Sequence, residues 1–106
     1  MINKQEVDRK QATPFRVIIV DDEPLARRLI IASLIAHPEF EVVAECANGR
    51  QAVDAVETLS PDLMFLDIQM PGLGGFDVIR SVGSDKMPAV IFVTAFDAFA
   101  IDAFDA

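Results

Sequence analysis

The sequence contains no tryptophan and no tyrosine, and it has one cysteine and one histidine among its 106 residues. Its aromatic residues are eight phenylalanines, so buried aromatic rings bring no hydroxyl or indole N–H that needs a partner. Cys46 stands alone, which excludes an internal disulfide, and its apolar neighbours predict a buried, unreactive thiol. His37 directly precedes Pro38, which favours a helix end over a ligand position.

Basic residues are scarce. Nine lysines and arginines stand against 17 acids, which gives a formal net charge of −8 and a pI of ≈ 4.4. This charge argues against binding of nucleic-acid phosphates by the chain. No apolar stretch approaches the ~20 residues of a membrane span, and the polar residues 1–12 lack the apolar core of a signal peptide. We therefore expect a cytoplasmic domain that contacts neither nucleic acid nor membrane.

What the sequence does contain is the composition of a globular domain, with 52% hydrophobic and 25% charged residues. A length of 106 residues allows one domain with little to spare. Residues 1–14 mix charges, amides and small residues without a period, which predicts a flexible N-terminal tail. We expect the folded domain to occupy residues 15–106.

Short apolar runs alternate with helical patterns four times along the sequence. The expected strands are residues 17–20, 40–47, 63–66 and 89–93. The expected helices are residues 24–37, 49–59, 76–82 and 96–106. Such alternation with short connections produces right-handed βαβ units and a parallel sheet that is covered on both faces. The sequence therefore predicts an α/β fold with a doubly wound parallel sheet.

Helical spacing also predicts which side chains are buried. In the first helix, Leu25, Leu29 and Ile30 form the expected apolar face, while Arg27 and Arg28 point elsewhere. The faces expected in the next two helices are Ala52, Val56 and Leu59, and then Phe76, Ile79 and Val82.

Two of the apolar runs stop abruptly at acids. The first ends in Asp21 and Asp22, and the third ends in Asp67. Ligands of open α/β sheets bind outside the carboxyl ends of the strands. If these two strands are neighbours, three carboxylates meet in one crevice and repel one another unless a cation lies between them. A divalent cation is the expected occupant.

Each of these features also has an explanation without function. Asp21, Asp22 and Glu23 could form a helix N-cap, where the helix dipole favours acids, and Asp67 could cap the turn to Gly72. Thr94 could be a strand-end hydroxyl that bonds to the backbone. The glycines of residues 71–75 indicate a flexible turn, because the lysine of a phosphate-binding P-loop is absent. These explanations do not account for the order in which the motifs occur.

Taken together, the motifs resemble the receiver domain of two-component response regulators. They are residues 20–24, residues 67–71 with Gly75 following, and Thr94–Ala95 after the fourth strand. Residues 96–106 further resemble the fourth helix of receivers attached to LytTR-type DNA-binding domains. The resemblance implies a flavodoxin-like receiver fold with sheet order 2-1-3-4, in a sequence that ends before the family's fifth strand and fifth helix.

The resemblance also implies roles for individual residues. Asp67 would be the phosphoacceptor, taking a phosphoryl group from a sensor histidine kinase to form an acyl phosphate. Mg²⁺ would be bound by Asp22, Asp67 and the backbone carbonyl of Gln69, with Asp21 acting through a coordinated water. Thr94 would hydrogen-bond the phosphoryl group. Such a receiver is not an enzyme beyond its own phosphorylation and dephosphorylation.

The sequence departs from the family pattern in one respect. In the family a lysine follows the fifth strand, whereas the last lysine here, Lys86, precedes the fourth strand and cannot take that role. We therefore expect impaired phosphorylation or impaired coupling to the switch. Without a fifth strand, strand 89–93 becomes an apolar edge, and we expect self-association through it and through helix 96–106.

One other function stays open, and another is disfavoured. The chain could be a dimerisation or interaction module that works without phosphorylation. A magnesium-dependent phosphatase with an aspartyl nucleophile is disfavoured, because such enzymes typically carry a second acid two residues after the nucleophile, where this chain has Gln69.

Overall fold

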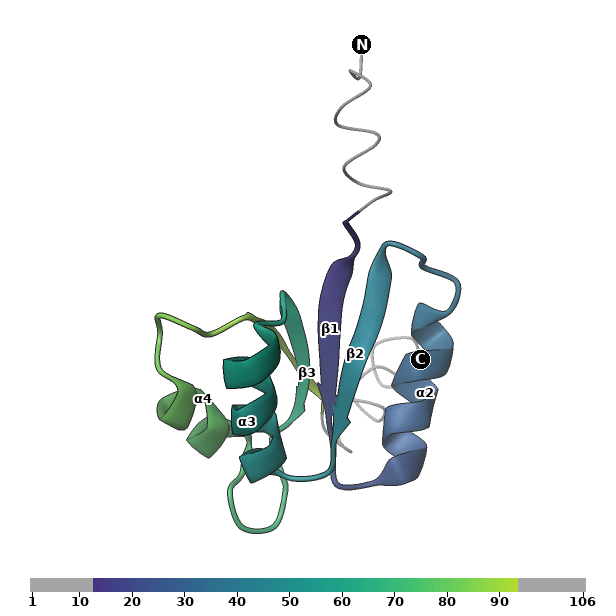
Figure 1. The fold of residues 1–106 in the computed structure, drawn as a ribbon. Coiled ribbons are helices and arrows are strands. Elements are labelled where there is room, and N and C mark those ends of the chain that lie inside the picture. Colours follow the sequence, from purple (N-terminus) through teal and green to yellow (C-terminus); the bar gives the residue numbers. More distant parts are fainter. Residues whose placement is uncertain (1–12, 94–106) are drawn as a thin grey trace, which may run out of the picture.

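The computed structural model describes residues 13–93, which form a parallel four-stranded sheet with helices on both faces (Figure 1). The strands are β1 (Phe15–Val20), β2 (Phe40–Cys46), β3 (Leu63–Asp67) and β4 (Ala89–Val93). The helices are α2 (Pro24–Leu34), α3 (Gly49–Leu59) and α4 (Gly75–Val82). All strand pairs are parallel and the order is β2-β1-β3-β4, which confirms the predicted doubly wound fold.

Several predictions concern residues outside the described part of the chain. These are most of the tail over residues 1–14, the strand end at Thr94–Ala95 and the helix over residues 96–106. They stay predictions. Within residues 13–93, no helix combines the length and the apolar character that crossing a membrane requires.

The two central strands are the most deeply buried part of the domain. Residues 17–20 of β1 are at most 1% exposed, and Met64 and Leu66 of β3 are fully buried. A strand covered on both faces needs an unbroken apolar run, which explains why residues 17–20 do not alternate with polar residues. Cys46 at the end of β2 is also buried, and burial raises the pKa of its thiol to about 11, so the thiol is unreactive at neutral pH.

Helices α3 and α4 lie on one face of the sheet (Figure 1). Asn48 caps α3, because its Oδ1 accepts the Gln51 backbone N–H at 2.9 Å. Ala52 and Val56 are buried as predicted. In α4 the predicted face is wrong at one position: Phe76 is 53% exposed, and the fully buried residue is Val78.

Helix α2 lies on the opposite face (Figure 1), and its predicted buried side is wrong at Leu25 and Leu29 but right at Ile30. Leu25 and Leu29 are 70% and 71% exposed. The partly buried stripe instead runs through Ala26, Ile30 and Leu34. Both sets of residues have the four-residue spacing of a helix face. The spacing alone therefore cannot tell which side of α2 faces the sheet, because this depends on how the chain leaves β1. The helix also ends at Leu34, earlier than predicted.

Candidate functional site

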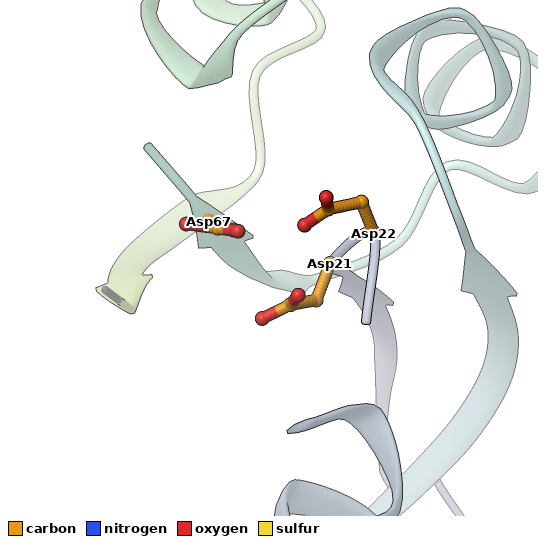
Figure 2. Close-up of side chains that lie close together, drawn as sticks. All are labelled: Asp21, Asp22 and Asp67. Carbon is orange, nitrogen blue, oxygen red and sulfur yellow. The ribbon is translucent and has the colours of Figure 1, made fainter. Parts of the chain in front are cut away.

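The acids that end β1 and β3 meet at the carboxyl edge of the sheet. Val20 and Leu66 are register partners in neighbouring strands, so the residues that follow them, Asp21 and Asp67, lie next to each other. Side-chain oxygens of Asp21, Asp22 and Asp67 all lie within 4.8 Å of one another. Figure 2 shows the three side chains converging from the ends of the two strands. The strand order reverses between β1 and β3, which is where open α/β sheets bind ligands.

The acids line an open crevice of ≈ 230 Å³. Asp21 and Asp67 are only 5% and 7% exposed, whereas Asp22 is exposed. The remaining walls are Glu23, Ala26, Gln69 and Val93. A small cation can therefore reach all three carboxylates from the open side.

Backbone hydrogen bonds orient the two buried carboxyl groups. Asp21 Oδ1 accepts the Glu23 N–H at 2.9 Å, and Asp67 Oδ1 accepts the Gln69 N–H at 3.0 Å. Of the three acids that could form the N-cap of α2, Glu23 takes that position without a side-chain bond, and Asp21 and Asp22 lie ahead of it. The carboxyl group of Asp67 does bond to the turn that follows it, but at Gln69 rather than near Gly72.

Burial makes the charged forms of these acids unfavourable. Desolvation raises the pKa of Asp67 to about 6, the Gln69 N–H opposes this rise, and the charges of Asp21 and Asp22 add to it. Desolvation also raises the pKa of Asp21, against the opposing Glu23 N–H. The donors are all carboxylate oxygens, which Mg²⁺ and similar hard cations prefer. A bound cation would remove the repulsion that the three acids share.

The other predicted site residues are placed less completely. Gln69 lines the crevice, while the prediction that its backbone carbonyl is a metal ligand stays a prediction. Thr94 lies outside the described residues, directly after Val93, which is the register partner of Asp67. Lys86 is exposed and precedes β4, so it lies toward the edge of the sheet opposite the acids, as the sequence indicated.

Gly75 packs directly against the backbone at the end of β3. A Cβ atom there would lie 2.7 Å from the Asp67 carbonyl oxygen and 2.8 Å from the Ile68 Cα. The Gly75 N–H donates to the Ile68 carbonyl at 3.1 Å. The sequence placed Gly75 both in a flexible turn and in the receiver motif, and in that turn only Gly72, with a φ of 75°, needs glycine for its backbone conformation. Gly75 is needed for close approach.

Sequence reasoning missed Arg27, which it placed on the outer side of α2. Its side chain is only 15% exposed, Nη1 donates to the Asp21 carbonyl at 2.6 Å, and Nε donates to Glu45 Oε1 at 3.2 Å. A signal was present, because Arg27 precedes the partly buried Ile31 and Leu34 by four and seven residues, the spacing of one helix face.

Comparison with known proteins decides the family. The chain matches the response regulator receiver domain over residues 17–106. It belongs to this family. The receiver is 46% identical over 90 residues to the transcriptional regulatory protein BtsR of Salmonella typhi, a match that covers 85% of this chain and 38% of that protein. The receiver therefore spans about two fifths of the length of this curated relative.

Solved structures agree with this assignment. The receiver is similar to the signal receiver domain of the putative response regulator NarL from Mycobacterium tuberculosis, with a TM-score of 0.72, 31% identity, and coverage of 88% of this chain and 77% of that one. It is also similar to a chain in the complex of the P1 domain of CheA3 with CheY6 from R. sphaeroides (TM-score 0.67, 29% identity, coverage 89% and 78%). The predicted receiver fold is confirmed, and the domain takes part in two-component signalling.

Proposed function

We propose that this receiver accepts a phosphoryl group from a sensor histidine kinase on Asp67, with Mg²⁺ bound at the acids. The observation that carries the proposal is the convergence of three carboxylates, within 4.8 Å of one another, at the ends of the two central strands. The similarity to a chain of the CheA3–CheY6 complex supports a histidine kinase as the partner. The domain acts on itself and turns over no separate substrate.

In the proposed reaction a carboxylate oxygen of Asp67 attacks the phosphorus atom of the donor. A P–O bond to Asp67 forms while the bond from phosphorus to the donor's imidazole nitrogen breaks, and its electron pair leaves with that nitrogen. The Gln69 N–H holds the carboxyl group in one orientation before the donor arrives. The apolar side chains of Ala26 and Val93 line the same crevice beside the reacting carboxylate.

The residues of the crevice suit a magnesium ion. We assign Asp22, Asp67 and the Gln69 carbonyl as direct ligands, with Asp21 acting through a water, and Thr94 as a hydrogen-bond donor to the phosphoryl group. When bound, Mg²⁺ supplies positive charge that offsets the acids and the phosphoryl oxygens.

The function is tested by intact-mass measurement after incubation with Mg²⁺ and a small acyl-phosphate donor. The wild type is expected to gain the mass of one phosphoryl group, and Asp67→Asn is expected to gain none, because an amide is not a nucleophile of this kind. Asp54→Asn, at an exposed position of α3, is the matched control and should be phosphorylated like the wild type. A gain in Asp67→Asn, or no gain in the wild type, would overturn the proposal.

We also propose that the receiver belongs to a cytoplasmic transcriptional regulator of the LytTR type. The resemblance of residues 96–106 supports the subtype, and the name of the BtsR relative supports transcriptional regulation. With a net charge of −8, residues 1–106 are unsuited to hold DNA phosphates. On this proposal DNA binding belongs to a separate output domain.

A second candidate function is self-association through β4, with or without phosphorylation. In the described part of the chain β4 is an edge strand that pairs only with β3. Ile91 and Phe92 are 45% and 39% exposed. The ring centroids of Phe92 and of the exposed Phe76 are 5.5 Å apart. An apolar edge of this kind pairs readily with a second copy of the chain.

Light scattering after size-exclusion chromatography tests this candidate. We expect a dimer at micromolar concentration for the wild type and a monomer for Ile91→Lys, because a charged side chain blocks edge pairing. Leu29→Lys adds the same charge at an exposed apolar position on α2 and should stay dimeric. A monomeric wild type, or equal dimerisation of the two variants, would rule out pairing through β4.

A further inference from the structure

Arg27 links the first two strands immediately behind the acidic crevice. Its Nη1 donates to the backbone carbonyl of Asp21 at the end of β1, and its Nε donates to Glu45 on β2. The distances are 2.6 and 3.2 Å, and the arginine side chain is 15% exposed. The guanidinium thus spans two strands from a position on α2.

Three hydrogen bonds fix Asp21 from different directions. Its backbone N–H donates to the Cys46 carbonyl at 3.0 Å, and its carboxylate accepts the Glu23 N–H at 2.9 Å. Arg27 supplies the bond to the remaining polar group, the backbone carbonyl. That carbonyl belongs to the peptide plane between Asp21 and Asp22, so its direction sets where the Asp22 Cα and side chain begin.

We propose that Arg27 is a positioning residue for the metal site, holding the Asp21–Asp22 peptide so that both carboxylates face Asp67. The inference rests on the proposed function, because it assumes that these acids bind Mg²⁺. Arg27 acts through the backbone and contacts neither the ion nor the phosphoryl group. Groups that orient metal ligands in this way typically change metal affinity by about 10- to 100-fold when removed.

A positioning role and a charge role of Arg27 predict opposite changes in Mg²⁺ affinity when the residue is removed. If Arg27 acted only through its charge, its removal would leave the acids more negative and Mg²⁺ would bind more tightly. If Arg27 orients the acids, its removal must weaken Mg²⁺ binding despite the lost repulsion. Lysine separates the roles further, because it keeps the charge but lacks the planar fork that reaches two acceptors at once.

Calorimetric titration of Mg²⁺ into the wild type, R27A, R27K and R28A is the test. We expect about tenfold weaker binding for R27A and R27K. Arg28 is exposed, and its side chain forms no hydrogen bond with another residue of the described range. R28A therefore removes an equal charge and should bind Mg²⁺ as tightly as the wild type or slightly more tightly. Wild-type or tighter binding by R27A, or full affinity in R27K, would overturn the proposal.

A second readout does not depend on the metal. Amide hydrogen exchange at Glu23 reports the bond from its N–H to the Asp21 carboxylate, and we expect faster exchange in R27A and R27K than in R28A. If the wild type bound no Mg²⁺, the proposed metal site would fail, and Glu23 exchange alone would decide whether Arg27 positions Asp21. Unchanged exchange would overturn the positioning role.

Circular dichroism melts check that each variant is folded. Should R27A fold poorly, E45A provides the same test, because it removes the other anchor of the guanidinium at a half-exposed position. It is expected to weaken Mg²⁺ binding in the same direction by a smaller factor. Unaltered Mg²⁺ affinity in both E45A and R27K would contradict the proposal that Arg27 acts by bonding to Asp21 and Glu45 together.

Discussion

Gly75→Ala is expected to lower the free energy of unfolding by about 1–3 kcal/mol, the usual range for a side chain forced into a packed site. The new Cβ would lie 2.7 Å from the Asp67 carbonyl oxygen and 2.8 Å from the Ile68 Cα. Both are backbone atoms, so no flexible side chain can move aside. The end of β3 or the start of α4 must shift. Urea denaturation at neutral pH measures the loss.

The same shift should slow phosphoryl uptake, since a displacement of about 1 Å at a reacting group can cost as much as ~100-fold in rate. Gly72→Asn is the control in the same loop. Gly72 has a φ of 75° and no atom within 4 Å of an added Cβ, and asparagine tolerates this conformation better than most residues. Equal effects of the two substitutions would show that close packing at Gly75 does not position Asp67.

Mg²⁺ affinity is expected to fall about tenfold for each pH unit below 6, because Asp67 must lose its proton before it can bind the ion. The pKa of Asp67 is about 6, raised chiefly by burial. Affinity should level off above pH 7. Titration calorimetry between pH 5 and pH 8 measures this profile. Asp67→Asn should bind Mg²⁺ more weakly and lose this dependence, and a wild-type affinity that is flat across pH 6 would contradict the prediction.

In the metal-free protein, the free energy of unfolding should fall as pH rises, which is opposite to the trend of Mg²⁺ affinity. Asp67 titrates near 3.8 when unfolded and near 6 when folded, so between these values the folded state binds more protons. Its contribution therefore destabilises the fold as pH rises from about 4 to 6, by about 1–2 kcal/mol after allowance for solvent screening. The difference in unfolding free energy between the wild type and Asp67→Asn, measured in a chelator, isolates this contribution. A difference that changes in the other direction would refute it.

Local sequence was enough to predict the strands and the acids. Residues 17–20 are apolar without alternation because β1 is covered on both faces. In β3, Met64 and Leu66 are buried and Leu63 and Phe65 are partly buried. Acids follow both apolar runs in the chain, so parallel pairing alone brings Asp21 and Asp67 together. Nothing beyond strand assignment and neighbour order was needed to expect a crevice of carboxylates.

Features that depend on the phase of a helix could not be obtained in this way. Leu25 and Leu29 share helical spacing just as Ala26 and Ile30 do, and only the packing of α2 on the sheet decides between them. The burial of Arg27 depends on the same orientation of α2, because its long aliphatic stem lets this charged residue occupy a buried face. The close approach at Gly75 likewise appears only when α4 is placed against β3.

The pairing of Val20 with Leu66 fixes the register between β1 and β3. A slip of one residue between β1 and β3 would move Asp21 by about 3.3 Å relative to Asp67. The same slip would turn the side chains of the shifted strand to the opposite face of the sheet. Neither change can occur without the other. The packing of the buried aliphatic residues in the two central strands therefore fixes the spacing of the carboxylates.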